Sequence, residues 1–229
     1  MGTTSPMADP HAHDRLIATL GAGLAPVRRL RPPWLRTLGW LCVVAAIAVA
    51  LVARYGTAPM LARWAGAPDL GWAGLGAVLT AITAAWASFA LGVPGRSTAW
   101  AWLPLPSALL WTGASGLGCL RAWIAPATHV ASVPEAGDCL FFILGFSLPL
   151  SALLILLLRR ACPLRPVLTA VLVGLASAAA SASLLEICHA FDAAATDLLL
   201  HALAVAMVVG ANAALGGRLL SAGAGPRAG

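Results

Sequence analysis

The side chains that could do chemistry gather in one short stretch, LLEICHAFDAAATDLLLH, at residues 184–201. It holds a cysteine, two histidines and three carboxylates, in a chain with 60% hydrophobic and only 10% charged residues. Thiolates and imidazoles are the ligands that zinc, copper(I) and similar metals prefer. In an oxidising compartment, two thiols can instead join as a disulfide. The stretch therefore points to a metal site or to redox-active thiols, and its place in the fold must decide which partners it has.

Composition indicates that the elements positioning this stretch are membrane helices. A mean hydropathy of +0.89 is typical of an integral membrane protein and not of a water-soluble domain. A helix needs about 20 apolar residues to cross a bilayer. We therefore predict an all-α membrane protein with six transmembrane helices within residues 37–220. Their predicted bounds are Thr37–Ala53, Gly71–Val93, Ala99–Gly118, Cys139–Leu158, Val167–Ile187 and Leu198–Leu215.

The arginines predict the orientation of these helices. With both termini cytoplasmic, eleven of the fourteen arginines lie on the cytoplasmic side, as the positive-inside rule requires. The first 36 residues lack the apolar core of a secretory signal. We interpret residues 1–36 as a cytoplasmic segment and residues 221–229 as a disordered cytoplasmic tail. The opposite face then holds six of the eight acidic residues and only Arg54, Arg63 and Arg121.

This topology divides the five cysteines between different environments. Cys42 falls within the first span and is expected to be a small buried residue. Cys162 falls in a cytoplasmic loop, where it should stay reduced. Three others lie at the outer ends of predicted helices: Cys119, Cys139 and Cys188.

The outer cysteines share their layer with His189 and His201. We expect these five residues to form a redox or metal-sensing site, through a thiophilic metal bound by Cys139, Cys188 and His189 or through a disulfide. For the disulfide, Cys139 could pair with either Cys188 or Cys119. No C-x-x-C or H-E-x-x-H spacing selects between the two chemistries. His201 fits equally a hydrogen bond to a neighbouring helix and a functional role.

The N-terminal segment carries an amphipathic pattern. Asp14 is a plausible N-cap, and an apolar face follows at helical spacing, formed by Leu16, Ile17, Leu20, Leu24 and Val27. The basic residues Arg28, Arg29 and Arg31 come next. Such a helix could lie on the inner leaflet, or it could dock into a groove of a cytoplasmic protein.

The remaining patterns argue against catalysis. The chain shows no catalytic triad, phosphate loop or nucleic-acid motif, so we expect neither an enzyme nor direct nucleic-acid binding. The run VGLASAAASAS, residues 173–183, predicts close helix packing, and VPGR, residues 93–96, predicts a tight turn with positive φ at Gly95. A sensor or scaffold is favoured; a membrane metal transporter or a thiol oxidoreductase using the same outer cysteines is the alternative.

Several segments in their order resemble the negative-regulator-of-sigma-F family of bacterial inner-membrane anti-sigma factors. They are LIATLGAGLAPVRRLRPPWLR, VPGR, GLGCLRAW, DCLFFILGFSLPLSALLILLLRRACPLRP and CHAFDAAATDLLLH. The resemblance implies a multi-pass protein of the inner membrane with six transmembrane helices. It implies a cytoplasmic N-terminus that holds an extracytoplasmic-function sigma factor away from RNA polymerase. It also implies stress-responsive periplasmic cysteines, which match Cys139 and Cys188 and, less closely, Cys119. We expect no resident cofactor, and at most a transient thiophilic metal ion.

Overall fold

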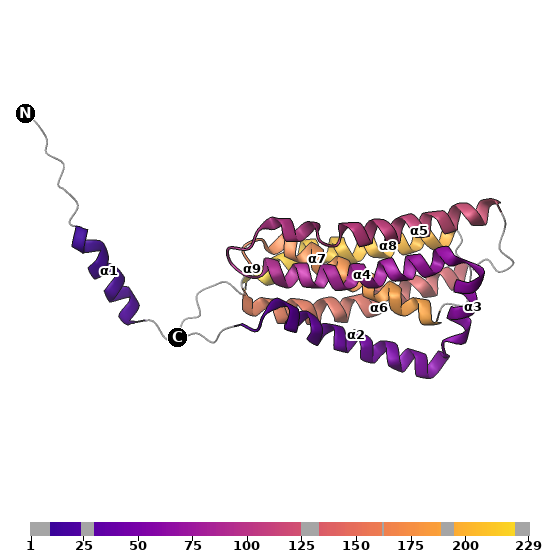
Figure 1. The fold of residues 1–229 in the computed structure, drawn as a ribbon, viewed down its shortest axis with the longest axis horizontal. Coiled ribbons are helices and arrows are strands. Elements are labelled where there is room, and N and C mark those ends of the chain that lie inside the picture. The colour runs from indigo at the N-terminus through magenta and orange to yellow at the C-terminus, as the bar shows by residue number, and fades with distance from the viewer. Residues whose placement is uncertain (1–9, 24–29, 125–132, 162, 189–194, 223–229) are drawn as a thin grey trace, which may run out of the picture. The chain divides into compact units, whose positions relative to one another are not determined.

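All the regular structure in the described part of the chain is helical (Figure 1). The computed structural model describes residues 10–23, 30–124, 133–161, 163–188 and 195–222. Residues 1–30 and 31–229 form two separate units. The first contains α1 (Pro10–Ala22). The second contains α2 (Pro33–Tyr55), α3 (Ala58–Gly66), α4 (Pro68–Leu91), η1 (Thr98–Trp102), α5 (Leu105–Ile124), α6 (Val133–Leu158), η2 (Arg159–Ala161), α7 (Pro166–Cys188), α8 (Ala195–Ala211), η3 (Asn212–Gly216) and α9 (Gly217–Ala222).

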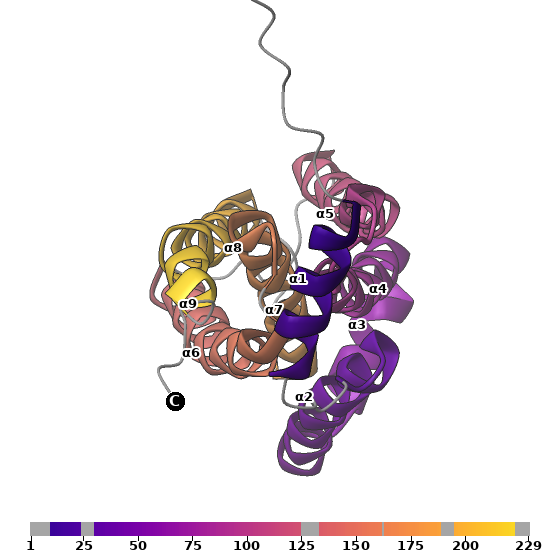
Figure 2. The same cartoon turned by 90° about the vertical axis from the view of Figure 1, so that its left-hand side faces the viewer.

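The second unit is a bundle in which α2, α4, α5, α6, α7 and α8 run side by side (Figures 1 and 2). Among the described residues, five helices are long and apolar enough to cross a membrane, at residues 33–55, 68–91, 137–158, 166–188 and 198–220. These five match five of the predicted spans. The remaining predicted span begins later than expected, because residues 98–102 form a 3-10 helix and α5 starts only at Leu105. Its three glycines and Arg121 lower its hydropathy, so the sixth crossing stays a prediction.

The centre of the bundle is α7, as its small residues predict. Ala176, Ser177, Ala179 and Ser181 are all buried. The backbones of α7 and α8 approach so closely that a Cβ on Gly174 would lie 2.8 Å from the Cα of Val209. Small residues permit this approach, and in a bilayer dispersion contacts between close helices are a main source of packing energy. The prediction of a packing face at residues 173–183 is therefore confirmed.

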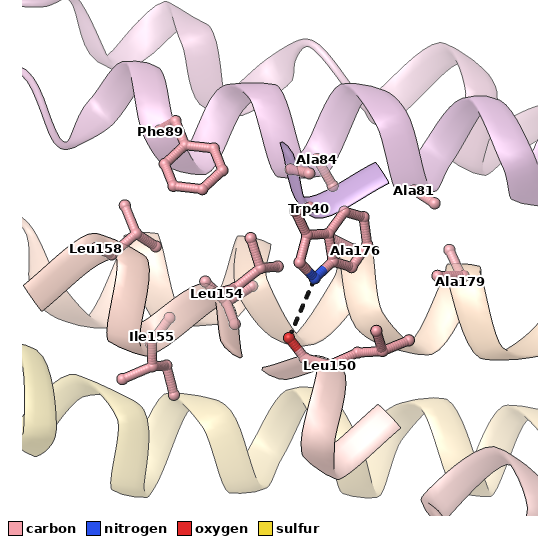
Figure 3. Packing of buried hydrophobic residues seen from close by; sticks show 14 of the residues in the cluster. Trp40, Ala81, Ala84, Phe89, Leu150, Leu154, Ile155, Leu158, Ala176 and Ala179 are labelled. Atoms are coloured by element: carbon pink, nitrogen blue, oxygen red, sulfur yellow. Dashed lines mark hydrogen bonds between the residues drawn. The ribbon is translucent and has the colours of Figure 1, made fainter. Parts of the chain in front are cut away.

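The main core cluster joins α2, α4, α6 and α7 around Trp40 (Figure 3). The Trp40 indole is fully buried, and its Nε1 donates a hydrogen bond to the Leu150 carbonyl of α6 at 3.2 Å. Cys42, two residues later, points away from this core and is exposed on the bundle. The prediction of a buried Cys42 is wrong, because α2 is an outer helix that buries only one face.

The connections and ends refine three further predictions. Gly95 has φ 80°, so the predicted turn with positive φ is confirmed. The N-cap at Asp14 is wrong, because α1 already begins at Pro10 and includes the two histidines before Asp14. A proline suits the first helical turn, where no partner is needed for its missing N–H. The short helix α3 was not predicted, and most of the expected C-terminal tail, residues 223–229, lies outside the described residues.

Candidate functional site

The structure brings Cys139 and Cys188 together at one end of the bundle, here called the thiol end. Cys139 lies near the start of α6, and Cys188 is the last residue of α7. Both belong to a small cluster that also contains Ile143, Leu185 and Ala204. Cys139 is buried with 6% exposure, Cys188 is half-buried, and both are free thiols. Two cysteines 49 positions apart in the sequence therefore belong to one apolar cluster, which joins α6, α7 and α8.

Helix α3 packs against this end and fixes a charged pair beside the thiols. Arg63 of α3 donates from Nη2 to the Glu186 carbonyl at 2.7 Å and to its Oε2 at 3.3 Å. The side chains of Arg63 and Glu186 are only 10% and 25% exposed. Trp64 packs on α4, where a Cβ on Gly74 would meet its ring at 3.2 Å. Because Arg63 contacts α7 and Trp64 contacts α4, α3 links these two helices. The link to α7 lies at Glu186, two residues before Cys188.

Sequence reasoning missed this pair. The sequence identified Arg63 as one of three arginines on the outer face. It did not predict α3, the helix that brings Arg63 to Glu186. A second pair joins Arg121 of α5 to Asp69 at the start of α4, with Nε 3.1 Å from Oδ1. Two of the six carboxylates expected on the outer face are thus paired with arginine, so that face is less acidic than the sequence count suggests.

The structure gives less information on the other predicted members of the site, Cys119, His189 and His201. Cys119 lies within α5, while His189 falls outside the described residues. His201 is half-buried on α8, three residues before Ala204 of the thiol cluster, so the two lie on adjoining positions of one helix face. No group of three histidine, cysteine or acidic residues that could hold a metal ion occurs within the described ranges. The two described thiols could supply two soft ligands to a metal, and further ligands would have to come from elsewhere.

The N-terminal part of the predicted site is exposed. On α1, Leu16, Ile17 and Leu20 are 54%, 67% and 63% exposed, so the predicted apolar face is present as far as it is described. Arg31 is exposed just before α2. The other predicted partner-binding residues lie outside the described residues: Leu24, Val27, Arg28 and Arg29.

The start of α2 is fastened to the bundle at the end opposite the thiols. The Arg36 Nη2 donates a hydrogen bond to the Leu157 carbonyl in the last turn of α6. The Arg36 guanidinium also lies over the Phe89 ring of α4, 4.5 Å from its centroid. A planar guanidinium can satisfy a carbonyl and stack on a ring at once, which an ammonium does less well. Arg36 therefore ties the chain leaving the N-terminal segment to α4 and α6.

Helix α6 links the two ends of the bundle physically. Cys139 and Leu157 are eighteen residues apart on one helix, which corresponds to about 27 Å of rise. Pro149 lies inside α6 and has no N–H, so the helix lacks one hydrogen bond near its middle. Trp40 and Arg36 of α2 hold the α6 carbonyls of Leu150 and Leu157, both beyond this point. A displacement of α6 would thus act directly on α2 through these two hydrogen bonds.

Comparison with known proteins gives one match. A family model described as "Negative regulator of sigma F" matches residues 20–221, which covers both the thiol end and the start of α2. No curated protein and no solved structure matches the chain.

Proposed function

Since the chain belongs to the negative-regulator-of-sigma-F family, we propose that it is an anti-sigma factor of the bacterial inner membrane. In this proposal the N-terminal segment faces the cytoplasm. There it binds an extracytoplasmic-function sigma factor and keeps it from RNA polymerase. The observation that carries the proposal is the exposed apolar face of α1, formed by Leu16, Ile17 and Leu20.

This face has the features of a helix that docks into a groove of another protein. Residues at positions i, i+1 and i+4 of a helix fall within a stripe about 100° wide, the width of a typical apolar face, and amphipathic helices bind grooves through such faces. A helix of 13 residues is marginally stable alone in water, so a partner that covers the face would stabilise it. Arg28, Arg29 and Arg31 follow in the sequence and would add charge pairing with an acidic partner surface.

Release of the sigma factor is proposed to begin at Cys139 and Cys188. Metal binding by the two thiolates would draw the outer ends of α6 and α7 together. Oxidation of the two thiols to a disulfide by an external two-electron oxidant, with release of two protons, would do the same. The movement of α6 would reach α2 through Trp40 and Arg36. Changing the released fraction from about 1% to about 99% requires a bias of about 5.5 kcal/mol between the two states. A strong metal site provides more binding free energy than this, so a metal that binds only one of the two states can supply the bias.

Capture of the sigma factor by the full-length protein tests the binding half of the proposal. Leu20→Asp places a charge in the apolar face and is expected to abolish capture, because a buried unpaired carboxylate opposes docking. Ala18→Asp is the matched control. It adds the same charge on α1 about 150° from the centre of the apolar face, and capture should persist. If Leu20→Asp still captures the sigma factor as well as the unchanged protein does, helix docking is wrong.

A further inference from the structure

A groove open to the outside of the bundle lies between α6 and the final segments η3 and α9. Its volume is about 300 Å³, and it runs along α6 from Leu148 to Arg159. These eleven steps of helix correspond to about 16 Å. One leaflet of a bilayer has about 15 Å of hydrocarbon, half of the full core. The groove therefore has the length of one leaflet, and it lies in the half of the bundle away from the thiols.

The walls of the groove are apolar and accessible. Leu148 and Leu156 of α6 are 56% and 58% exposed, and Leu215 and Leu219 on the other side are 60% and 48% exposed. The floor is buried, with Ile155 only 8% exposed. This arrangement offers a long apolar channel to whatever surrounds the bundle, which in a membrane is lipid.

The amide nitrogen of Asn212 on the floor of the groove is already hydrogen-bonded within the protein. Asn212, which is 5% exposed, donates from Nδ2 to Ser151 Oγ at 3.0 Å and to the Val208 carbonyl at 2.9 Å. Both hydrogens of the amide are thus used within the protein. Gly216 keeps the floor low, because a Cβ there would already lie 3.2 Å from Ile155 Cδ1. With no amide hydrogen left to donate, the floor suits a hydrocarbon chain better than a polar solute.

Positive charge marks one end of the groove only. Arg159 lines this end. Arg160, the next residue of η2, and Arg218, which precedes the groove-lining Leu219 in α9, are both exposed. The segments 159–169 and 211–222 contain no acidic residue. Basic pockets between helices on the cytoplasmic side of membrane proteins bind anionic lipid headgroups. The charge is therefore complementary to a phosphate at the end of an acyl chain.

We propose that this groove is a binding site for an anionic phospholipid, with one acyl chain along Leu148, Leu156 and Leu215 and the phosphate at Arg159. The proposal is independent of sigma-factor binding. It requires only that the bundle lie in a membrane, and it assigns the π-helical segment η3 a role in shaping the site. Interruptions of this kind in helices occur frequently at functional sites.

Native mass spectrometry of the full-length protein tests this site. The purified protein is titrated separately with phosphatidylglycerol and phosphatidylcholine that carry identical acyl chains. The unchanged protein should bind phosphatidylglycerol at least about fivefold more tightly. Arg159→Ala should remove about fivefold of that affinity and should weaken phosphatidylcholine binding less, because the choline cation already balances the phosphate of that lipid. Ala152→Phe fills the groove from an exposed position and should weaken the binding of both lipids.

Two matched variants control for charge and for bulk. Arg96→Ala removes an exposed arginine outside the groove, and Ala46→Phe adds a ring at an exposed position of α2; both should bind lipid like the unchanged protein. Circular dichroism checks that each variant keeps its helix content. Equal affinity of the unchanged protein for the two lipids would overturn the headgroup site. Unchanged binding by Ala152→Phe would overturn the groove as the place where the chain lies.

Discussion

At the scale of single residues, the pair of thiols is the most chemically reactive feature of the described structure. Cys139 and Cys188 lie in one apolar cluster at the ends of two adjacent helices. A disulfide or a shared metal ion would pull on the ends of the two helices. Because a helix is stiff, a displacement of its end moves the rest of the helix as well. Cys42 is exposed on α2 and does not belong to that cluster.

The first prediction separates these cysteines by function. In cells carrying a reporter for the sigma factor, Cys139→Ser and Cys188→Ser should each remove induction by cadmium or by an oxidant, while repression without inducer persists. Cys42→Ser should leave induction within about twofold of the unchanged protein. Full induction in the double variant Cys139→Ser, Cys188→Ser would show that the signal enters elsewhere.

The second prediction concerns the Arg63–Glu186 pair. Arg63→Ala leaves a largely buried carboxylate without its cation and should lower the free energy of unfolding by about 1–3 kcal/mol. Arg54→Ala removes an exposed arginine expected on the same face and should change it by less than about 0.5 kcal/mol. Unfolding in detergent, followed by circular dichroism, gives both values. A double-mutant cycle with Glu186→Ala then isolates the pair, and a coupling near zero would show that Arg63 acts through packing alone.

At the scale of elements, α6 and α2 form the connection between the two ends of the molecule. Arg36 and Trp40 both contact carbonyls of α6, and Arg36 also stacks on Phe89 of α4. These two hydrogen bonds to one helix keep α2 aligned with α6. A displacement of α6 would therefore act on the start of α2.

The third prediction tests this connection. Arg36→Lys keeps the charge but loses the planar stacking and the directed hydrogen bond. We expect sigma-factor capture without inducer to remain, and induction of the reporter to fall severalfold. Arg96→Lys is the matched control, because Arg96 also stacks on a ring, that of Trp100 at 5.4 Å, but not from α2. Normal induction in Arg36→Lys would exclude this residue from the signalling route.

The fourth prediction concerns the contact between α4 and α5. A Cβ on Gly76 would lie 2.6 Å from the Trp111 backbone nitrogen, so Gly76→Ala must force the two helices apart. Such overpacking costs about 1–3 kcal/mol of stability. Gly113→Ala, in α5, meets nothing within 4 Å and should be neutral or stabilising by up to about 1 kcal/mol. The same unfolding assay compares them, and equal stability of the two variants would argue against this close approach.

At the scale of the whole molecule, the number of membrane crossings depends on α5. Five pass on length and hydropathy, while α5 runs beside them in the bundle with a more polar sequence. Its packing against α4 through Gly76 and the Arg121–Asp69 pair makes it part of the same unit. Neighbouring helices can satisfy polar residues that hydropathy counts as unfavourable.

The fifth prediction is therefore a topology with six crossings and both termini in the cytoplasm. Reporter fusions that are active only in the periplasm should be active after residue 128 and inactive after residue 95 and after the C-terminus. Fusions active only in the cytoplasm should give the opposite pattern. A C-terminus found outside would indicate five crossings and would place α5 on one side of the membrane.

The sequence by itself determined the helical membrane class, most span positions, the small-residue character of α7 and the turn at Gly95, and it named three cysteines as candidates for the site. These follow from local properties, because hydropathy over about 20 residues and turn chemistry over four residues do not depend on distant contacts. Only the tertiary structure decided that Cys139 and Cys188 share one cluster, that Arg63 reaches Glu186, and that Arg36 holds the end of α6. Each of those contacts joins residues far apart in the sequence, since helix packing sets them and no local pattern encodes the angle between two helices. The same reason explains why Cys42 was placed wrongly: apolarity locates a residue within a span, but only the neighbouring helices determine which face of the span is buried.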